Sequence, residues 1–259
     1  MKYLFIGDVV ASCGCKKLAS VLPSLKRETG AVLTVVNGEN SADGNGITPE
    51  SLRMLYNAGA DVVTTGNHVF RRREIYESLD GDETLLRPAN YPDAAPGHGV
   101  CIIDRGGWRG AVISLMGVYG INSPPACPFE TVDKLLSELE REGIKNVFVD
   151  LHAEATGEKR ALGFYLDGRV TAVLGTHTHV QTADEEILPG GTAYISDVGM
   201  TGPSLSCLGV KPQAVIRSLK DKMPSRFDTA DTPCYLNGVA VEFDHRTGRA
   251  LSVERIFIR

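Results

Sequence analysis

The chain has 259 residues, of which 42% are hydrophobic and 23% charged, and its formal net charge is −5 at pH 7. This composition is typical of a folded globular protein, so it excludes disorder throughout the chain, and the acidic balance argues against a general nucleic-acid or membrane surface. The length suits one large domain, and no internal repeat or linker divides it, so we expect a single domain over residues 1–259.

The sequence also indicates neither a membrane protein nor a disulfide-rich protein. No stretch approaches the ~20 apolar residues of a membrane-spanning helix, and the apolar run at residues 3–6 is too short for a signal peptide. We therefore expect a cytoplasmic protein. The six cysteines show no Cys-x-x-Cys pairing, which indicates neither a zinc knuckle nor a disulfide framework, so free thiols are expected.

Apolar runs of strand length alternate with helical spacing in the first half of the chain. Thr48 and Pro49 form a helix start, with Thr48 as the N-cap and Pro49 at the first helical position. Pro23 lies inside another helical pattern and is expected to end or kink that helix. The first half therefore predicts strands at residues 3–6, 31–36 and 61–65, and helices at 16–29 and 48–59.

The alternation continues in the second half. It predicts strands at 100–104, 111–115, 146–151, 170–174 and 192–196, helices at 129–142 and 212–222, and a closing hairpin of strands at 236–243 and 250–258. Strands that alternate with helices indicate a layered α/β fold, and the hairpin indicates mixed sheets. Ligands of such folds gather at the carboxyl ends of strands.

Five short segments place chemically active side chains at such positions. They are Gly7-Asp8, Gly38-Glu39-Asn40, Gly66-Asn67-His68, His152 and the run from Gly175 through His177 to His179. Most of them follow an apolar run. Together they supply carboxylate, amide and imidazole groups, which is the ligand set of a two-metal centre, and such centres usually cleave phosphoesters.

Each segment has its own chemical logic. The carboxylate of Asp8 is a hard oxygen ligand, and Glu39 can place one oxygen on each of two ions. His177 and His179 are two residues apart, which sends both imidazoles to the same side of an extended chain. Taken singly, each segment is weak evidence, because an aspartate often caps a turn and a lone histidine usually fills a loop.

Asn67 and His68 complete the set. The side-chain carbonyl of Asn67 suits a crowded site that already holds carboxylates. His68 adjoins it, and a histidine with an ordinary pKa near ~6.5 can deliver a proton to a leaving oxygen at neutral pH.

Two neighbouring groups have an open role. The run Arg71-Arg72-Arg73 follows His68 and reads either as a phosphate clamp or as the solvated start of a charged helix. Asp150 and Glu154 flank His152; either could orient its second ring nitrogen, or simply lie at the surface.

The motifs resemble those of the calcineurin-like metallophosphoesterases, and within them the bacterial YmdB-like subfamily. The similar stretches span nearly the whole chain and lie at residues 4–10, 37–40, 66–68, 87–90, 150–156, 175–184 and 197–203. The subfamily pattern is specific, because the common superfamily motif opens with Asp-x-His whereas this chain has Asp8-Val9-Val10.

The resemblance implies a four-layer α/β/β/α sandwich with mixed sheets and a site for two metal ions, iron or manganese by family and zinc by ligand type. It implies that Glu39 bridges the ions and that His68 is the proton donor. One ion would be held by Asp8, Asn40 and His179, and the other by Asn67, His152 and His177. The implied activity is hydrolysis of cyclic nucleotides, notably 2′,3′-cyclic ones, by a metal-bound hydroxide.

One departure and several alternatives stay open. Where the subfamily tends to read Gly-Ser-Pro-Gly-Arg, residues 11–16 read Ala-Ser-Cys-Gly-Cys-Lys, which leaves the role of Cys13 and Cys15 undefined. A nucleotide-sensing regulatory binder with little turnover is the alternative from another class. A nuclease or a phosphomonoesterase is the alternative among enzymes, although the acidic charge argues against a long nucleic acid as substrate. A homo-oligomer also stays open.

Overall fold

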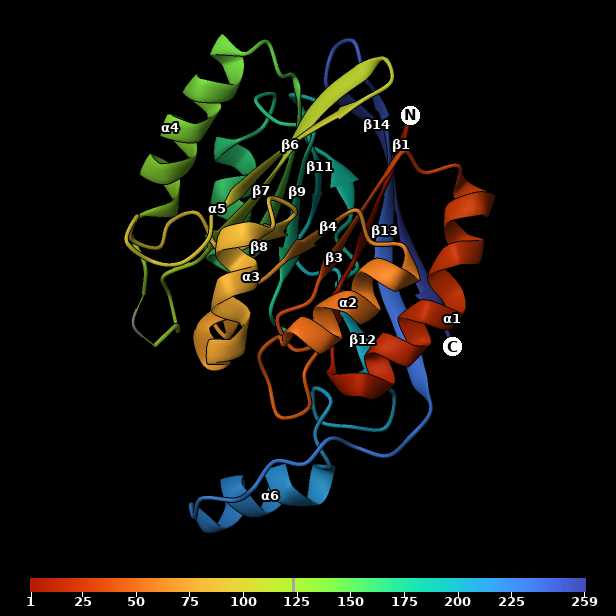
Figure 1. Cartoon of the computed structure of the whole chain (residues 1–259), viewed down its shortest axis with the longest axis vertical. Coiled ribbons are helices and arrows are strands. Elements are labelled where there is room, and N and C mark those ends of the chain that lie inside the picture. The colour runs from red at the N-terminus through yellow and green to blue at the C-terminus, as the bar shows by residue number, and fades with distance from the viewer. Residues whose placement is uncertain (123) are drawn as a thin grey trace.

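The computed structural model describes residues 1–122 and 124–259, and in it two mixed β-sheets stack face to face between outer helices (Figure 1). The first sheet has the order β2-β12-β13-β1-β3-β4-β5, and β14 pairs with β13. Its strands are β1 (Lys2–Ile6), β2 (Asp8–Val9), β3 (Leu33–Asn37), β4 (Val62–Thr64), β5 (Leu85–Leu86), β12 (Met200–Pro203), β13 (Cys234–Asp244) and β14 (Arg249–Ile258).

The second sheet has the order β10-β11-β9-β8-β7-β6. Its strands are β6 (Val100–Arg105), β7 (Trp108–Met116), β8 (Asn146–His152), β9 (Ala172–Thr176), β10 (Glu186–Ile187) and β11 (Ala193–Ile195). Strands β7, β8 and β9 run parallel, as do β1, β3 and β4 in the first sheet. The sheets are therefore mixed, as the closing hairpin predicts.

Helices cover the outer face of each sheet, which completes the predicted four layers (Figure 1). The first sheet carries α1 (Ala11–Thr29) and α2 (Pro49–Ala58), and the second carries α4 (Pro128–Arg141) and α5 (Thr156–Tyr165). The remaining helices are η1 (Val69–Arg71), η2 (Arg73–Ile75), α3 (Tyr76–Gly81) and α6 (Pro212–Asp221). Among the described residues, no helix is both long enough and apolar enough to cross a membrane.

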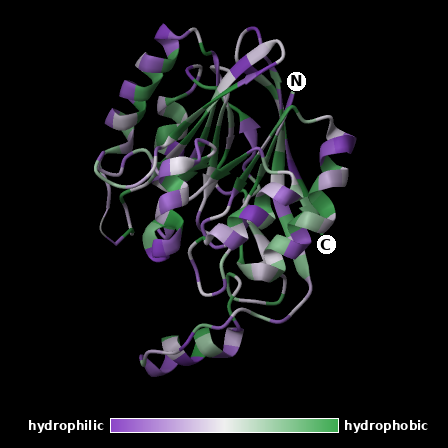
Figure 2. Cartoon of the chain, in the orientation of Figure 1, coloured by the Kyte–Doolittle hydropathy of each residue, from purple (hydrophilic) through white to green (hydrophobic). Residues whose placement is uncertain are grey.

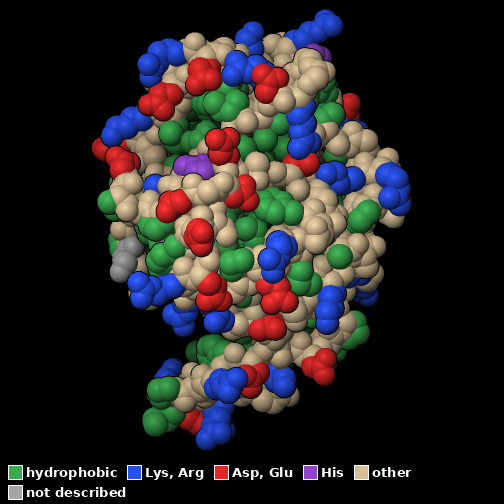
Figure 3. Space-filling view, viewed as in Figure 1, with side chains coloured by type: hydrophobic (Ala, Val, Ile, Leu, Met, Phe, Trp, Pro, Cys, Tyr) green, Lys and Arg blue, Asp and Glu red, His purple; other side chains and the backbone are tan. Residues whose placement is uncertain are grey.

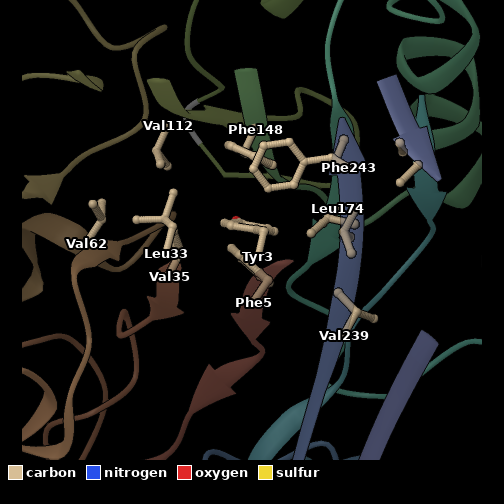
Figure 4. Close-up of a cluster of buried hydrophobic side chains, with 14 of the residues drawn as sticks. Tyr3, Phe5, Leu33, Val35, Val62, Val112, Phe148, Leu174, Val239 and Phe243 are labelled. Atoms are coloured by element: carbon tan, nitrogen blue, oxygen red, sulfur yellow. The ribbon is translucent and has the colours of Figure 1, made fainter. Parts of the chain in front are cut away.

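Side-chain alternation along the strands builds three apolar layers. Tyr3 and Phe5 of β1 point between the sheets, where the Tyr3 ring stacks on Phe148 of β8 with centroids 4.1 Å apart (Figure 4). Leu4 and Ile6 point the other way, into the layer under α1 and α2. A third apolar layer lies between the second sheet and the helices α4 and α5. Figure 2 shows the corresponding hydrophobic strands between helices of mixed character.

Of the two effects expected of Pro23, an end or a kink of the helix, the first is wrong, because α1 begins at Ala11 and continues past Pro23 to Thr29. Leu18, Leu22 and Leu25 are buried beneath this helix. Each buried leucine contributes roughly 1.5–3 kcal/mol, whereas an internal proline costs about 3 kcal/mol. Packing of the helix on the sheet therefore outweighs the proline.

The start of α2 is confirmed in detail. Thr48 is the N-cap, its hydroxyl accepts a hydrogen bond from the Ser51 backbone N–H at 3.1 Å, and Pro49 occupies the first turn. The sequence patterns missed α3, α5 and the short strands β2, β5, β10 and β12. These strands lie outside the apolar runs that predict the other strands, including the equally short β4 and β11.

Candidate metal centre

The five segments meet where the two sheets present their strand ends. Asp8 lies in β2, Glu39 and Asn40 follow β3, Asn67 and His68 follow β4, His152 ends β8, and His177 and His179 follow β9. Each of these eight residues lies within 3.3 Å of another member of the set. We call this group the eight-residue cluster.

Glycine at position 66 makes room for this convergence. A Cβ atom on Gly66 would lie 2.2 Å from Cδ2 of His152 and 2.4 Å from Oε2 of Glu39. No side chain can occupy that space unless His152 or Glu39 moves. The turn after β4 therefore needs glycine because of the cluster beside it and not because of its own backbone angles.

Glu39 lies at the middle of the cluster and is 1% exposed. Its Oε1 is 3.2 Å from Nε2 of His152 and 3.2 Å from Nδ1 of His68, while its Oε2 accepts a hydrogen bond from the backbone N–H of His68. Burial by itself would raise the pKa of Glu39, but the imidazoles of His152 and His68 hold it well below the ordinary value. Glu39 is thus a buried carboxylate that stays ionised.

His152 is fully buried, and its two ring nitrogens have different partners. Nδ1 donates to the Thr176 hydroxyl at 2.8 Å, because that hydroxyl donates its own proton to Asp150 at 2.7 Å. Nε2 faces Asn67 Oδ1 at 3.0 Å and Nδ1 of His177 at 3.1 Å. Burial lowers the pKa of His152, but the carboxylates of Glu39, Asp8 and Asp150 together raise it to about 9.

His177 is oriented by Glu154, whose carboxylate lies 2.9 Å from Nε2 of the ring. This leaves Nδ1 facing His152 and Glu39. Ligand atoms of Glu39, His152 and His177 all lie within 4.8 Å of one another, close enough to share one cation. Burial and the neighbouring His152 lower the pKa of His177, which favours the neutral imidazole that a metal requires.

The other side of the cluster is formed by Asp8, Asn40 and His179. Asp8 is fully buried, and neither carboxylate oxygen has a hydrogen-bond partner among the described residues, although Oδ2 lies 3.1 Å from Nε2 of His179. Nδ1 of His179 lies 3.1 Å from the Leu208 carbonyl, which accepts from the ring N–H. Nδ2 of Asn40 lies 3.3 Å from Nε2 of His179.

Two histidines adopt unusual backbone conformations. His177 has φ of 99° and His179 has φ of 62°, in the left-handed region that residues with a side chain rarely occupy. Such strain persists only where the surrounding structure imposes it. Here it lets the chain turn after β9 so that both imidazoles meet the cluster.

These residues fit divalent cations. A buried carboxylate without a hydrogen-bond partner is costly unless a charge compensates it, and Asp8 is such a group. The donors around it are carboxylate and amide oxygens and imidazole nitrogens, which suit iron, manganese or zinc. The buried Asp8 carboxylate, which faces His179 but has no hydrogen-bond partner among the described residues, is therefore the structural signature of a cation site.

The structure also resolves the groups whose role the sequence left open. Neither Asp150 nor Glu154 contacts His152 directly: Asp150 acts through Thr176, and Glu154 orients His177. Cys15 is buried, its thiol donates to the Ser41 carbonyl, and burial raises its pKa to about 12, which favours the neutral thiol. The sequence patterns do not identify Thr176 and Leu208 as partners of the histidines. Thr176 could have been found from the sequence, because it lies within the Gly175–His179 run.

Comparison with known proteins identifies the chain's family. The model of the YmdB-like protein family matches residues 4–256. The chain belongs to the YmdB-like family. It is 45% identical to the 2′,3′-cyclic-nucleotide 2′-phosphodiesterase of Bacillus subtilis (strain 168), over 100% of this chain and 97% of that protein.

Solved structures agree with this YmdB-like assignment. A phosphatase from Mycoplasma pneumoniae superimposes with a TM-score of 0.93 at 33% identity, covering 100% of this chain and 93% of that one. The NAD nucleotidase of Haemophilus influenzae superimposes with a TM-score of 0.64 at 13% identity over 99% of this chain and 55% of that one, a likeness of fold alone. The fold is that of the calcineurin-like phosphoesterases, and this YmdB-like chain is a phosphoric diester hydrolase. Its family implies divalent metal ions.

Proposed function

We propose that the chain hydrolyses 2′,3′-cyclic nucleotides at a centre of two metal ions held by the eight-residue cluster. The observation that carries the metal site is the fully buried Asp8 carboxylate without a hydrogen-bond partner, facing His179. The observation that carries the substrate is the 45% identity to a 2′,3′-cyclic-nucleotide 2′-phosphodiesterase over the whole chain. We further propose that residues 1–259 act as one domain in the cytoplasm.

The cluster divides into two ligand groups around Glu39. Asp8, Asn40 and His179 would hold one ion, and Asn67, His152 and His177 the other, with Glu39 between them because it contacts residues of both groups. Asn40 directs its amide nitrogen toward His179 and Glu39, so ligation through its oxygen requires the amide to turn over. Iron or manganese is the proposed metal, with zinc as the alternative.

When bound, two divalent ions activate water and polarise the phosphoryl oxygens. The chain itself supplies the proton for the leaving oxygen. The Asn40 amide lies 2.9 Å from Nδ1 of His68 and orients the imidazole: its Oδ1 accepts the ring N–H as placed here, and its NH2 group would donate to Nδ1 once the amide has turned over. The His68 side chain is 30% exposed, against 20% for His177, 11% for His179 and 0% for His152, so it is the most accessible imidazole of the cluster for proton delivery to a substrate.

The test combines metal analysis with hydrolysis. Freshly purified protein is expected to contain close to two equivalents of metal and to hydrolyse 2′,3′-cyclic AMP, whereas Asp8→Asn is expected to lose at least one equivalent and most of the turnover. Circular dichroism and thermal unfolding in chelator check that Asp8→Asn is folded, so that its loss of metal and turnover can be assigned to the site.

Other outcomes would replace the proposal. Tight binding of the cyclic nucleotide without turnover would identify a regulatory sensor. Turnover confined to linear oligonucleotides or to phosphomonoesters would identify a nuclease or a phosphomonoesterase. Full activity of metal-free protein would contradict the metal centre itself.

A further inference from the structure

A cavity of about 320 Å³ opens directly beside the metal centre. Asn40 and His179 of the eight-residue cluster form one end of it. The rest of the lining includes Asn45 from the loop before α2, Arg71 from η1, and Phe227 and Thr229 from the segment that returns from α6. A cavity of this size suits a small ligand such as a nucleoside.

Phe227 is held in a defined place relative to the metal centre. The segments on either side of α6 pair with each other, through an antiparallel bridge between Val210 and Thr229 and a hydrogen bond from the Ala230 N–H to the Gly209 carbonyl. The neighbouring Leu208 carbonyl accepts the hydrogen bond from His179. One short ribbon therefore links the ring of Phe227 to a residue of the cluster.

The ring of Phe227 is also accessible, with 51% of the residue exposed. Helix α6, which lies between the two paired segments, projects away from the body of the molecule (Figure 1, Figure 3). None of the ten residues of this helix is buried. The chain thus leaves the body, forms α6, and returns to place an aromatic side chain at the cavity. An exposed aromatic side chain in a cavity beside the proposed metal centre can stack on a nucleic-acid base.

The first two of the three arginines after His68, Arg71 and Arg72, have separate roles. Arg72 donates to the backbone carbonyls of Asp43 and Asn45 and so holds the loop that forms one wall. Arg71 is exposed, and its side chain lines the cavity. It is the only Lys, Arg, Asp or Glu among the described residues of the lining, so the cavity of this acidic protein presents positive charge to an anion.

We propose that this cavity is the nucleoside subsite of the enzyme, in which Phe227 stacks on the base and Arg71 attracts the phosphate-bearing ligand. The proposal rests on the function proposed above and specifies its substrate class: nucleoside cyclic phosphates, in preference to base-free sugar phosphates. Every base has a π-face, so stacking on one ring predicts little discrimination among the four bases.

The experiment measures binding by calorimetry on manganese-loaded protein with two probes, adenosine 3′-monophosphate and ribose 3-phosphate. The unmodified protein is expected to bind the nucleotide more tightly. Phe227→Ala should weaken nucleotide binding about 5- to 150-fold and so remove most of the difference between the probes, because a base stacked on an aromatic ring contributes that much affinity. Phe227→Tyr, which keeps an aromatic face, should restore the difference.

Matched variants separate stacking from other effects. Phe164→Ala removes a phenylalanine of similar exposure (53%) on α5, away from the cavity, and should keep the full difference between the probes. Arg71→Ala should weaken both probes by a similar factor, because its charge acts on the anion that they share. Circular dichroism of each variant checks the fold.

Two results overturn the subsite: equal affinity of the unmodified protein for both probes, or an unchanged affinity difference in Phe227→Ala. Failure of the proposed function is distinct. In that case the manganese-loaded protein does not hydrolyse 2′,3′-cyclic AMP, while its preference for the nucleotide over ribose 3-phosphate and the loss of that preference in Phe227→Ala remain.

Discussion

At the scale of single residues, the metal centre is organised by partners that set which nitrogen of each histidine is free. The Thr176 hydroxyl accepts a hydrogen bond from Nδ1 of His152, and the Leu208 carbonyl accepts one from Nδ1 of His179. Glu154 pairs with Nε2 of His177. Each partner leaves the opposite nitrogen directed into the cluster. The three histidines are therefore pre-oriented before any cation binds.

His68 provides the sharpest test at this scale. Replacing His68 with alanine should reduce kcat roughly 10²–10⁴-fold, the usual contribution of a positioned general acid, while metal content stays the same. Steady-state kinetics and elemental analysis of the same preparation measure both quantities. An unaltered kcat would remove His68 from the proton transfer, and a loss of metal would make it a ligand instead.

At the scale of elements, the loop after β9 must be held in place because it carries both His177 and His179. Asp184, later in this loop, accepts hydrogen bonds from the backbone N–H and the hydroxyl of Ser196, just after β11. Burial opposes ionisation of Asp184, but these hydrogen bonds lower its pKa below the ordinary value of 3.8. The carboxylate therefore ties the histidine loop to the neighbouring strand.

Asp184→Ala should lower the free energy of unfolding by about 1–3 kcal/mol at pH 7, because the Ser196 groups lose their acceptor. Since the folded-state pKa of Asp184 is lowered, its ionic contribution is present above pH 3.8 and is lost as the pH falls through the folded-state value. The difference in the free energy of unfolding between the unmodified protein and Asp184→Ala should therefore narrow toward pH 3. Denaturant unfolding in chelator from pH 7 to pH 3 measures it, and a difference that widens in acid would contradict this account.

At the scale of the whole molecule, the cluster joins the two sheets. Glu39 and Asn67 follow strands of the first sheet, whereas His152 and His177 belong to the second. Their side chains meet where the strands of both sheets end. Cations bound there would link the layers in addition to the apolar core between them.

Metal removal should consequently destabilise the entire fold. A ligand that binds only the folded state at 100 times its Kd adds about 2.7 kcal/mol, so chelation should lower Tm by several degrees, and added Mn²⁺ should raise it in a concentration-dependent way. Thermal unfolding at a series of Mn²⁺ concentrations measures the shift. A Tm independent of Mn²⁺, in protein shown to be metal-free at the start, would be evidence against a site at the sheet junction.

Much of the fold was predictable because its signals are local. The strand β8 and the helix α2 follow from an apolar run and from the Thr48-Pro49 start, and both are confirmed. Helix α5 was missed because it is short and contains Gly157 and Gly163. Gly163 packs against the Tyr194 ring, where a Cβ would come within 2.6 Å, so tertiary contact explains a residue that weakens the helical pattern.

The sequence by itself determined the alternation of strands and helices, the strand-end positions of the eight cluster residues and the oxygen and nitrogen chemistry that suits a divalent cation. Those features depend on residue type and on neighbours a few positions away. Only the tertiary structure decided that Asp8 has no hydrogen-bond partner among the described residues and that Phe227 lines the cavity next to the centre. Contacts such as Asn40 with His179, 139 residues apart, arise from how the sheets stack, and no local pattern encodes that packing.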